Sequence, residues 1–147
     1  MATLAQGTVF RLKGDKPFKS GDYHVFVVVG RDNNGVTTLF VVNGTTQISG
    51  RSDYFNKRPE ISVADTTVTI PKGVYKFFSK ETMIDCNTVH RIVVDEINFD
   101  NDNLLFITSD KLSQKDTDAI VTAIQNSRLV REYVKKSINK MRAASST

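Results

Sequence analysis

Residues His24 to Gly50, HVFVVVGRDNNGVTTLFVVNGTTQISG, decide the fold of this chain. They hold two apolar runs, Val25 to Val29 and Val36 to Val42, on either side of Asn34-Gly35. Both positions of an Asn-Gly pair tolerate a positive φ, and such a pair between apolar runs is typical of a type I′ hairpin turn. The sequence therefore predicts two antiparallel strands joined by a turn at Asn34-Gly35.

Polar side chains stand at the end of this hairpin that is distal to the turn. His24 lies where the first strand begins, and Thr45, Thr46 and Gln47 lie where the second strand stops. Antiparallel pairing places the start of one strand beside the end of the next, so we expect these residues to lie close together. The open end of the hairpin is therefore a candidate site.

Length and composition favour a single globular domain over residues 1–147. The chain is 39% hydrophobic and 24% charged, and 147 residues are enough to bury a core. The one cysteine, Cys86, excludes an intramolecular disulfide and a multi-cysteine metal site, which fits a reducing compartment. The N-terminus shows no secretory pattern and no run of 18 apolar residues occurs, so we expect a soluble, cytoplasmic protein without a membrane segment.

The positive charge of the chain is concentrated near the C-terminus. Residues 128–142 hold six cationic side chains against the single acidic Glu132, which gives this segment +5 and, from the total of +4, leaves −1 for the rest. Such a segment is either an electrostatic handle for a phosphate backbone or a solvated helix face. The six cations are Arg128, Arg131, Lys135, Lys136, Lys140 and Arg142.

A first strand and a long loop are predicted ahead of the hairpin. Gly7 to Lys13 alternates in polarity, which is typical of a half-buried strand. Gly14 to Tyr23 has turn chemistry, with Lys16 and Lys19 on either side of Phe18. These side chains either grip a phosphate and stack a base, or belong to a plain surface loop.

Further strands are predicted after the hairpin. Arg51 to Pro59 has a loop composition, while Glu60 to Ile70 alternates as two short strands or one bent strand. Val74 to Phe78 and Val89 to Ile97 complete a count of about six strands. Many short strands with turns between them indicate a small barrel or sandwich, because closure removes exposed sheet edges.

Three other features receive structural assignments. His90 is predicted to be an exposed strand residue, and Cys86 a small buried apolar residue. Asp100 to Asn103 is predicted to be a turn, since the glycine and the terminal glutamate of a calcium loop are missing. We therefore expect no metal ion and no cofactor.

The C-terminal third changes to a helical period. A cap at Leu112 to Asp116 and apolar residues at helical spacing predict a helix from about Gln114 to Asn126. Ser127 either caps a second helix or lies within a continued one, and an apolar stripe runs on to Met141. The predicted fold is thus mainly β with one or two C-terminal helices (α+β), with a barrel over about 7–99 and helices over about 112–142.

These segments together resemble the MazF/PemK family of toxin ribonucleases. The sharpest similarity is Gly44 to Gly50 (GTTQISG), which is similar to the threonine-threonine-glutamine segment of that family and precedes an extended run, Glu60 to Val63. Asp22-Tyr23-His24 stands in the place of the family's glycine-histidine-arginine-proline segment, which leads into its second strand. Gly7 to Leu12 and the helix after Leu112 fit the same order, so the resemblance covers roughly residues 7–140.

The resemblance implies an SH3-like barrel, a homodimer, an antitoxin partner and metal-independent cleavage of single-stranded RNA. It implies that His24 is the catalytic acid or base and that Thr45 donates its hydroxyl to a phosphate oxygen. The substrate-binding residues would be Lys16, Lys19, Thr46, Gln47 and Arg51.

Two departures from the family pattern leave a second function open. The family's arginine falls on His24, with no arginine beside it, and its later carboxylate falls near Ser79, with Glu81 and Asp85 out of register. The alternative is a non-catalytic barrel that keeps the fold and binds RNA or a protein. Enzymatic activity is therefore an expectation that the sequence favours without deciding it.

Overall fold

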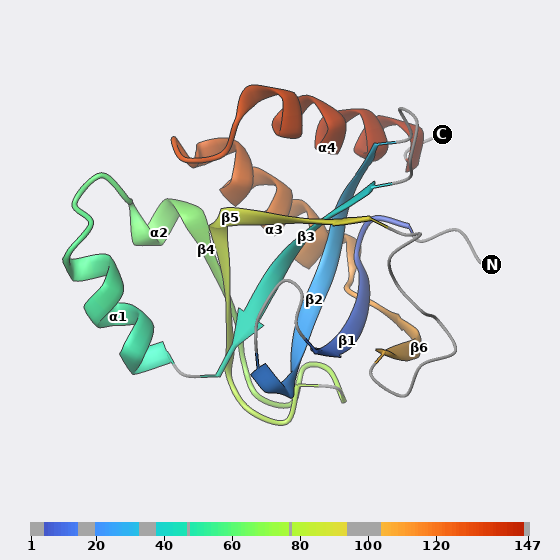
Figure 1. Ribbon diagram of the computed structural model, residues 1–147, viewed down its shortest axis with the longest axis horizontal. Coiled ribbons are helices and arrows are strands. Elements are labelled where there is room, and N and C mark those ends of the chain that lie inside the picture. The colour runs from blue at the N-terminus through green and yellow to red at the C-terminus, as the bar shows by residue number, and fades with distance from the viewer. Residues whose placement is uncertain are drawn as a thin grey trace.

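The computed structural model of the chain describes residues 5–14, 20–32, 38–46, 48–76, 78–93 and 104–145. Within them a sheet is followed by two C-terminal helices (Figure 1), so the predicted α+β class, mainly β with C-terminal helices, is confirmed. The strands are β1 (Thr8–Gly14), β2 (Ser20–Asp32), β3 (Thr38–Thr45), β4 (Thr67–Ile70), β5 (Thr82–Val93) and β6 (Leu104–Lys111). The helices are α1 (Ile48–Asn56), α2 (Val63–Thr66), α3 (Gln114–Asn126) and α4 (Glu132–Ser145).

The predicted hairpin is the centre of the sheet. Strands β2 and β3 pair antiparallel, with Val28 opposite Val41, as a two-residue turn at Asn34-Gly35 requires. The register then shifts by one residue, so that Asp32 faces Thr38 instead of the expected Thr37. A β-bulge between Val28 and Gly30 causes this shift, and the turn itself lies outside the described residues.

The six strands form an antiparallel sheet in the order β4-β5-β3-β2-β1-β6. The pairs join each strand to its neighbour in this order, and among the described residues β4 and β6 stand at the two ends without pairing to each other. The described part of the sheet is therefore open. The pairing does not confirm the predicted SH3-like barrel.

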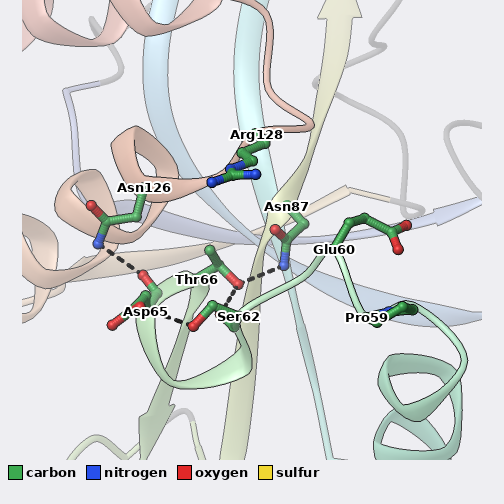
Figure 2. A pocket seen from close by; sticks show the side chains of 8 residues that line it. All are labelled: Pro59, Glu60, Ser62, Asp65, Thr66, Asn87, Asn126 and Arg128. Carbon is green, nitrogen blue, oxygen red and sulfur yellow. Dashed lines mark hydrogen bonds between the residues drawn. The ribbon is translucent and has the colours of Figure 1, made fainter.

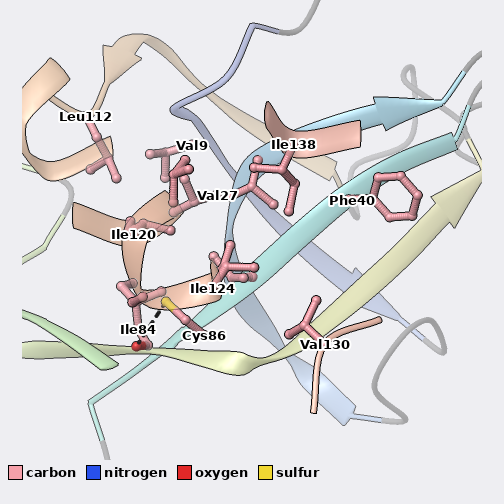
Figure 3. Close-up of a cluster of buried hydrophobic side chains, with 14 of the residues drawn as sticks. Val9, Val27, Phe40, Ile84, Cys86, Leu112, Ile120, Ile124, Val130 and Ile138 are labelled. Carbon is pink, nitrogen blue, oxygen red and sulfur yellow. Dashed lines mark hydrogen bonds between the residues drawn. The ribbon is translucent and has the colours of Figure 1, made fainter. Parts of the chain in front are cut away.

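One face of the sheet packs against the C-terminal helices and forms the main core. Strand residues such as Val27, Phe40 and Ile84 meet Ile120, Ile124 and Ile138 of α3 and α4 (Figure 3). Cys86 is fully buried in this core, as predicted. Four consecutive residues of β2, Phe26 to Val29, are also fully buried, so both faces of the hairpin are covered.

Helix α3 begins and ends where the sequence predicts. Ser113 caps it, with its hydroxyl accepting a hydrogen bond from the Asp116 backbone N–H at 3.2 Å. Ser127 ends this helix and α4 starts anew at Glu132, so the two helices are separate.

Two glycines allow close packing between the sheet and the helices. Gly7 has a φ of 93° and lies against Thr117 of α3, where an added Cβ would stand 2.7 Å from the hydroxyl oxygen. At Gly30, an added Cβ would stand 3.0 Å from Ile138 of α4 and 3.1 Å from Phe40. These contacts fix where each helix rests on the sheet.

Several local predictions are wrong. The predicted loop from Gly14 to Tyr23 is too long, because Gly14 and Ser20 pair in the β1–β2 hairpin. Arg51 to Pro59 is mostly helical, since α1 runs to Asn56, and Glu60 to Ile70 holds α2 before the short strand β4. No strand occurs in the described part of Val74 to Phe78, and β6 was not predicted. The turn predicted at Asp100 to Asn103 lies outside the described residues.

Candidate functional site

His24 and Thr45 lie at the open end of the hairpin, beside its outermost pair. Val25 of β2 pairs with Gly44 of β3, and His24 and Thr45 are the next residues outward on the two strands. Because partners in a pair share a face and successive residues alternate, His24 and Thr45 lie on the face opposite to that pair. Both side chains are half-buried, which places an imidazole and a hydroxyl in a partly desolvated position.

The next row on this face holds a buried amide and a buried carboxylate. Asn43 of β3 pairs with Asp85 of β5, and Asp85 is only 7% exposed. Its Oδ1 atom accepts hydrogen bonds from the backbone N–H and the side-chain amide of Asn87, both at 3.0 Å. Sequence reasoning noted Asp85 as a carboxylate out of register, but the strand pairing puts it on the face of His24 and Thr45.

Helix α1 closes one side of this end of the sheet. It starts directly after the second strand of the hairpin, and its Phe55 packs with Ile61 and with Met83, the cross-strand partner of Thr45. At its far end, the Arg58 Nε atom donates to Glu60 at 2.6 Å, and this bond raises the pKa of Arg58 and lowers that of Glu60. Both groups are solvent-exposed, so this ion pair contributes little to stability.

The remaining predicted contacts are not brought to the site by the described structure. Lys16, Lys19 and Gln47 lie outside the described residues. Arg51 lies in α1, with its side chain outside the described part, and Thr46 is exposed beside Thr45. Of the predicted set, His24 and Thr45 adjoin the same pair at the end of the hairpin, and the site roles of all these residues stay predictions.

His90 is not the exposed strand residue that the sequence predicts. It is half-buried on β5, and its ring meets Phe26 edge to face, with centroids 6.2 Å apart. Burial lowers the pKa of its imidazole, and the nearby Asp85 opposes that change. His90 therefore belongs to the packing of the hairpin.

Apart from this site, a hollow of about 560 Å³ lies between α2 and the connection of α3 to α4 (Figure 2). Its base is a buried hydrogen-bond network centred on Asn87. The Asn87 amide donates to Thr66 at 2.9 Å and to Asp85, and its oxygen accepts from Ser127 at 2.8 Å. The hollow is lined by Pro59, Glu60, Ser62, Asp65, Thr66, Asn87, Asn126 and Arg128.

A smaller hollow of about 220 Å³ shares Asn87 with the larger one. Arg91 of β5 and Arg131 line it, together with Tyr133 at the start of α4. Neither hollow was predicted, because Asn87 is joined to its partners across 21 and 40 residues of sequence. The only signal in the sequence was the basic composition of residues 128–142.

The described residues contain no cluster of three or more His, Cys, Asp or Glu side chains that could hold a metal ion. Among the described helices, none combines the length and the apolar character needed to cross a bilayer. Neither a scan against protein-family models nor a search among curated proteins finds a match for the chain.

Proposed function

We propose that this protein is a metal-independent endoribonuclease that cleaves single-stranded RNA, and the toxin of a toxin-antitoxin pair. The proposal joins the resemblance to MazF/PemK toxins with one observation: His24 and Thr45 both adjoin Val25–Gly44, the outermost pair at the open end of the hairpin. An imidazole beside a hydroxyl is a pair suited to phosphodiester transesterification, since one moves a proton and the other donates to a phosphate oxygen.

In the proposed reaction, the ribose 2′-oxygen forms a bond to phosphorus while the bond from phosphorus to the 5′-oxygen breaks. The 2′-hydroxyl loses a proton and the leaving 5′-oxygen gains one, so the products are a 2′,3′-cyclic phosphate and a 5′-hydroxyl. His24 carries one of these protons, and Thr45 donates a hydrogen bond to the charged phosphate oxygen. Asp85, a buried carboxylate on the same face, is suited to positioning these groups.

Several features belong to the same proposal. The sheet would close as an SH3-like barrel, two copies would form a homodimer, and the protein would act in the cytoplasm. Lys16, Lys19 and Arg51 would contact the RNA backbone, with Thr46 and Gln47 beside the reacting phosphate.

The proposal is tested by incubating the purified full chain with a long single-stranded RNA in EDTA. Wild-type protein is expected to cleave, leaving 2′,3′-cyclic phosphate or 3′-phosphate ends, and His24→Ala and Thr45→Ala are each expected to lower the rate by about 100-fold or more. Thr122→Ala is the matched control, because Thr122 is an exposed threonine of α3. Circular dichroism establishes that each variant is folded.

No cleavage by folded wild-type protein, freed of any bound antitoxin, would exclude the nuclease. The second candidate function, a non-catalytic RNA-binding module, is favoured by the exposed arginines of the smaller hollow, Arg91 and Arg131. It predicts RNA binding that weakens with salt in a protein that leaves the RNA intact.

A further inference from the structure

The two hollows lie along the connection between α3 and α4, and we refer to them together as the groove. They share the lining residue Asn87, and their lining residues run from Pro59 to Val134. The Tyr133 end of the smaller hollow lies away from the candidate site, because Tyr133 packs on Phe40, which pairs with Gly30 near the turn end of the hairpin. Six residues of β2 separate Gly30 from His24, which corresponds to about 20 Å along the strand. The larger hollow lies closer to that site, since its Asn87 donates a hydrogen bond to Asp85.

Three exposed arginines give the groove its positive charge. Arg128 lines the larger hollow, and Arg91 and Arg131 line the smaller one. Within the described part of the chain, none of the three forms an ion pair with a carboxylate. All three guanidinium groups are therefore available to an anion.

Of the two described acidic residues that line the groove, one is paired with a cation and the other is hydrogen-bonded to a neutral hydroxyl. Glu60 pairs with Arg58 at 2.6 Å, and Asp65 accepts a hydrogen bond from the Ser62 hydroxyl at 2.9 Å. Both line the larger hollow, and the smaller hollow has no acidic lining residue in the described part of the chain. Glu132 lies beside Arg131 and faces Lys135 at 3.8 Å. The balance of charge is most positive around Arg131 and Arg91.

A partly exposed aromatic ring lies beside these arginines. Tyr133 is 44% exposed, and the buried ring of Phe40 meets it edge to face at 6.4 Å between centroids. This contact holds the tyrosine in place while part of its ring faces the smaller hollow. Exposed Leu129 extends the apolar surface beside it.

We propose that this groove binds single-stranded RNA, with Arg128 and Arg131 on phosphates and a base stacked on Tyr133. Cationic side chains that follow a backbone, together with an aromatic stacking surface, are the common chemistry of single-strand binding. The network under Asn87 supports the site, because it ties β5, α2 and residue 127 into one rigid base. The choice of RNA rests on the proposed function, but Arg131 and Tyr133 of the smaller hollow lie away from His24.

The test is fluorescence anisotropy with a labelled 20-nucleotide 2′-O-methyl RNA, which has no 2′-hydroxyl and cannot be cleaved by transesterification. The double variant Arg128→Gln/Arg131→Gln is expected to bind about tenfold more weakly. For this variant, the slope of the logarithm of affinity against the logarithm of salt concentration should be shallower by about 1.4, because two phosphate contacts are lost. The matched control, Lys136→Gln/Lys140→Gln, removes the same charge from exposed positions of α4 outside both hollows. Equal losses in the two double variants would overturn the proposal.

Tyr133 is tested with two substitutions that differ in aromaticity. Tyr133→Phe is expected to bind RNA as the wild type does, whereas Tyr133→Leu should bind about tenfold more weakly, since base stacking is lost. Thermal unfolding verifies that both variants keep the fold. Equal affinities of the phenylalanine and leucine variants would contradict a stacking role.

The outcomes separate this inference from the nuclease proposal. RNA binding that depends on the groove, in a protein that never cleaves RNA, would support the groove and exclude the nuclease. If cleavage depends on His24 while the RNA affinity is the same in all groove variants, the nuclease proposal is supported and RNA binding in the groove is excluded.

Discussion

At the scale of single residues, Asn87 connects three segments that are distant in sequence. Its side chain joins β5 to Thr66 of α2 and to Ser127 at the end of α3, and all of these groups are buried. A buried amide that satisfies several partners at once is costly to remove, because the partners lose their hydrogen bonds without gaining water.

Asn87→Ala is expected to lower the free energy of unfolding by about 3 kcal/mol, since buried partners are left unsatisfied. Urea denaturation followed by circular dichroism measures this loss. Asn126→Ala is the matched control. Asn126 is exposed and donates a single hydrogen bond, to the Asp65 carbonyl at 3.0 Å, so the expected loss is about 1 kcal/mol or less. Similar losses in both variants would argue against the network.

The sequence identified some site residues and missed others for a physical reason. His24 and Thr45 belong to one hairpin, so local pairing rules were enough to predict that they lie at the same end of it, where Val25 pairs with Gly44. Asp85 and Asn87 lie in a segment without strand or helical period, and their partners are distant in sequence. Their roles follow from tertiary contacts that no local pattern records.

At the scale of elements, α4 rests on β2 at a position where only glycine fits without strain. An added Cβ at Gly30 would meet both Ile138 of the helix and Phe40 of the neighbouring strand. Because glycine has no side chain, α4 can approach the sheet closely here, and Gly30 therefore determines how closely α4 packs on β2.

Gly30→Ala is expected to destabilise the fold by about 1 to 3 kcal/mol, because the core around it has no spare room. This loss corresponds to a decrease in Tm of roughly 2 to 12 °C. Gly50→Ala provides the opposite control. Gly50 lies in α1 with nothing within 4 Å of an added Cβ, so alanine should stabilise the helix by up to about 1 kcal/mol. A destabilised Gly50→Ala would contradict the assignment of that helix.

Helix α1 also shows where local pattern misleads. Its sequence, ISGRSDYFN, has a glycine and two serines, and the part from Arg51 onward was predicted as a loop. Phe55 packs against Met83 and Ile61, and this apolar contact stabilises a helix that its polar composition does not predict. By contrast, α3 has a cap and a regular apolar stripe, so its limits were predictable from sequence.

At the scale of the whole molecule, His90 links stability to pH. Burial against Phe26 lowers the pKa of its imidazole in the folded state below the ordinary value near 6.5, while Asp85 limits the change. As the pH falls below about 6.5, the unfolded chain takes up a proton that the folded chain resists. Acid therefore favours unfolding through this residue.

We expect the stability of the wild type to decrease as pH falls below about 6.5, with a slope of at most about 1.4 kcal/mol per pH unit from this histidine. His90→Gln should have a shallower slope between pH 6.5 and 5, because glutamine does not titrate. Urea unfolding at a series of pH values measures both slopes. Parallel slopes for the two proteins would show that His90 does not carry this effect.

The central hairpin, the α+β class and the capped helix α3 could be predicted from the sequence alone. These features depend on periodicity, capping and turn chemistry, which act between residues close together in the chain. The open order of the described strands, the helix α1, the partial burial of His90 and the hollows around Asn87 became evident only from the tertiary structure. Each of these depends on contacts between segments far apart in sequence, where packing overrides local preference.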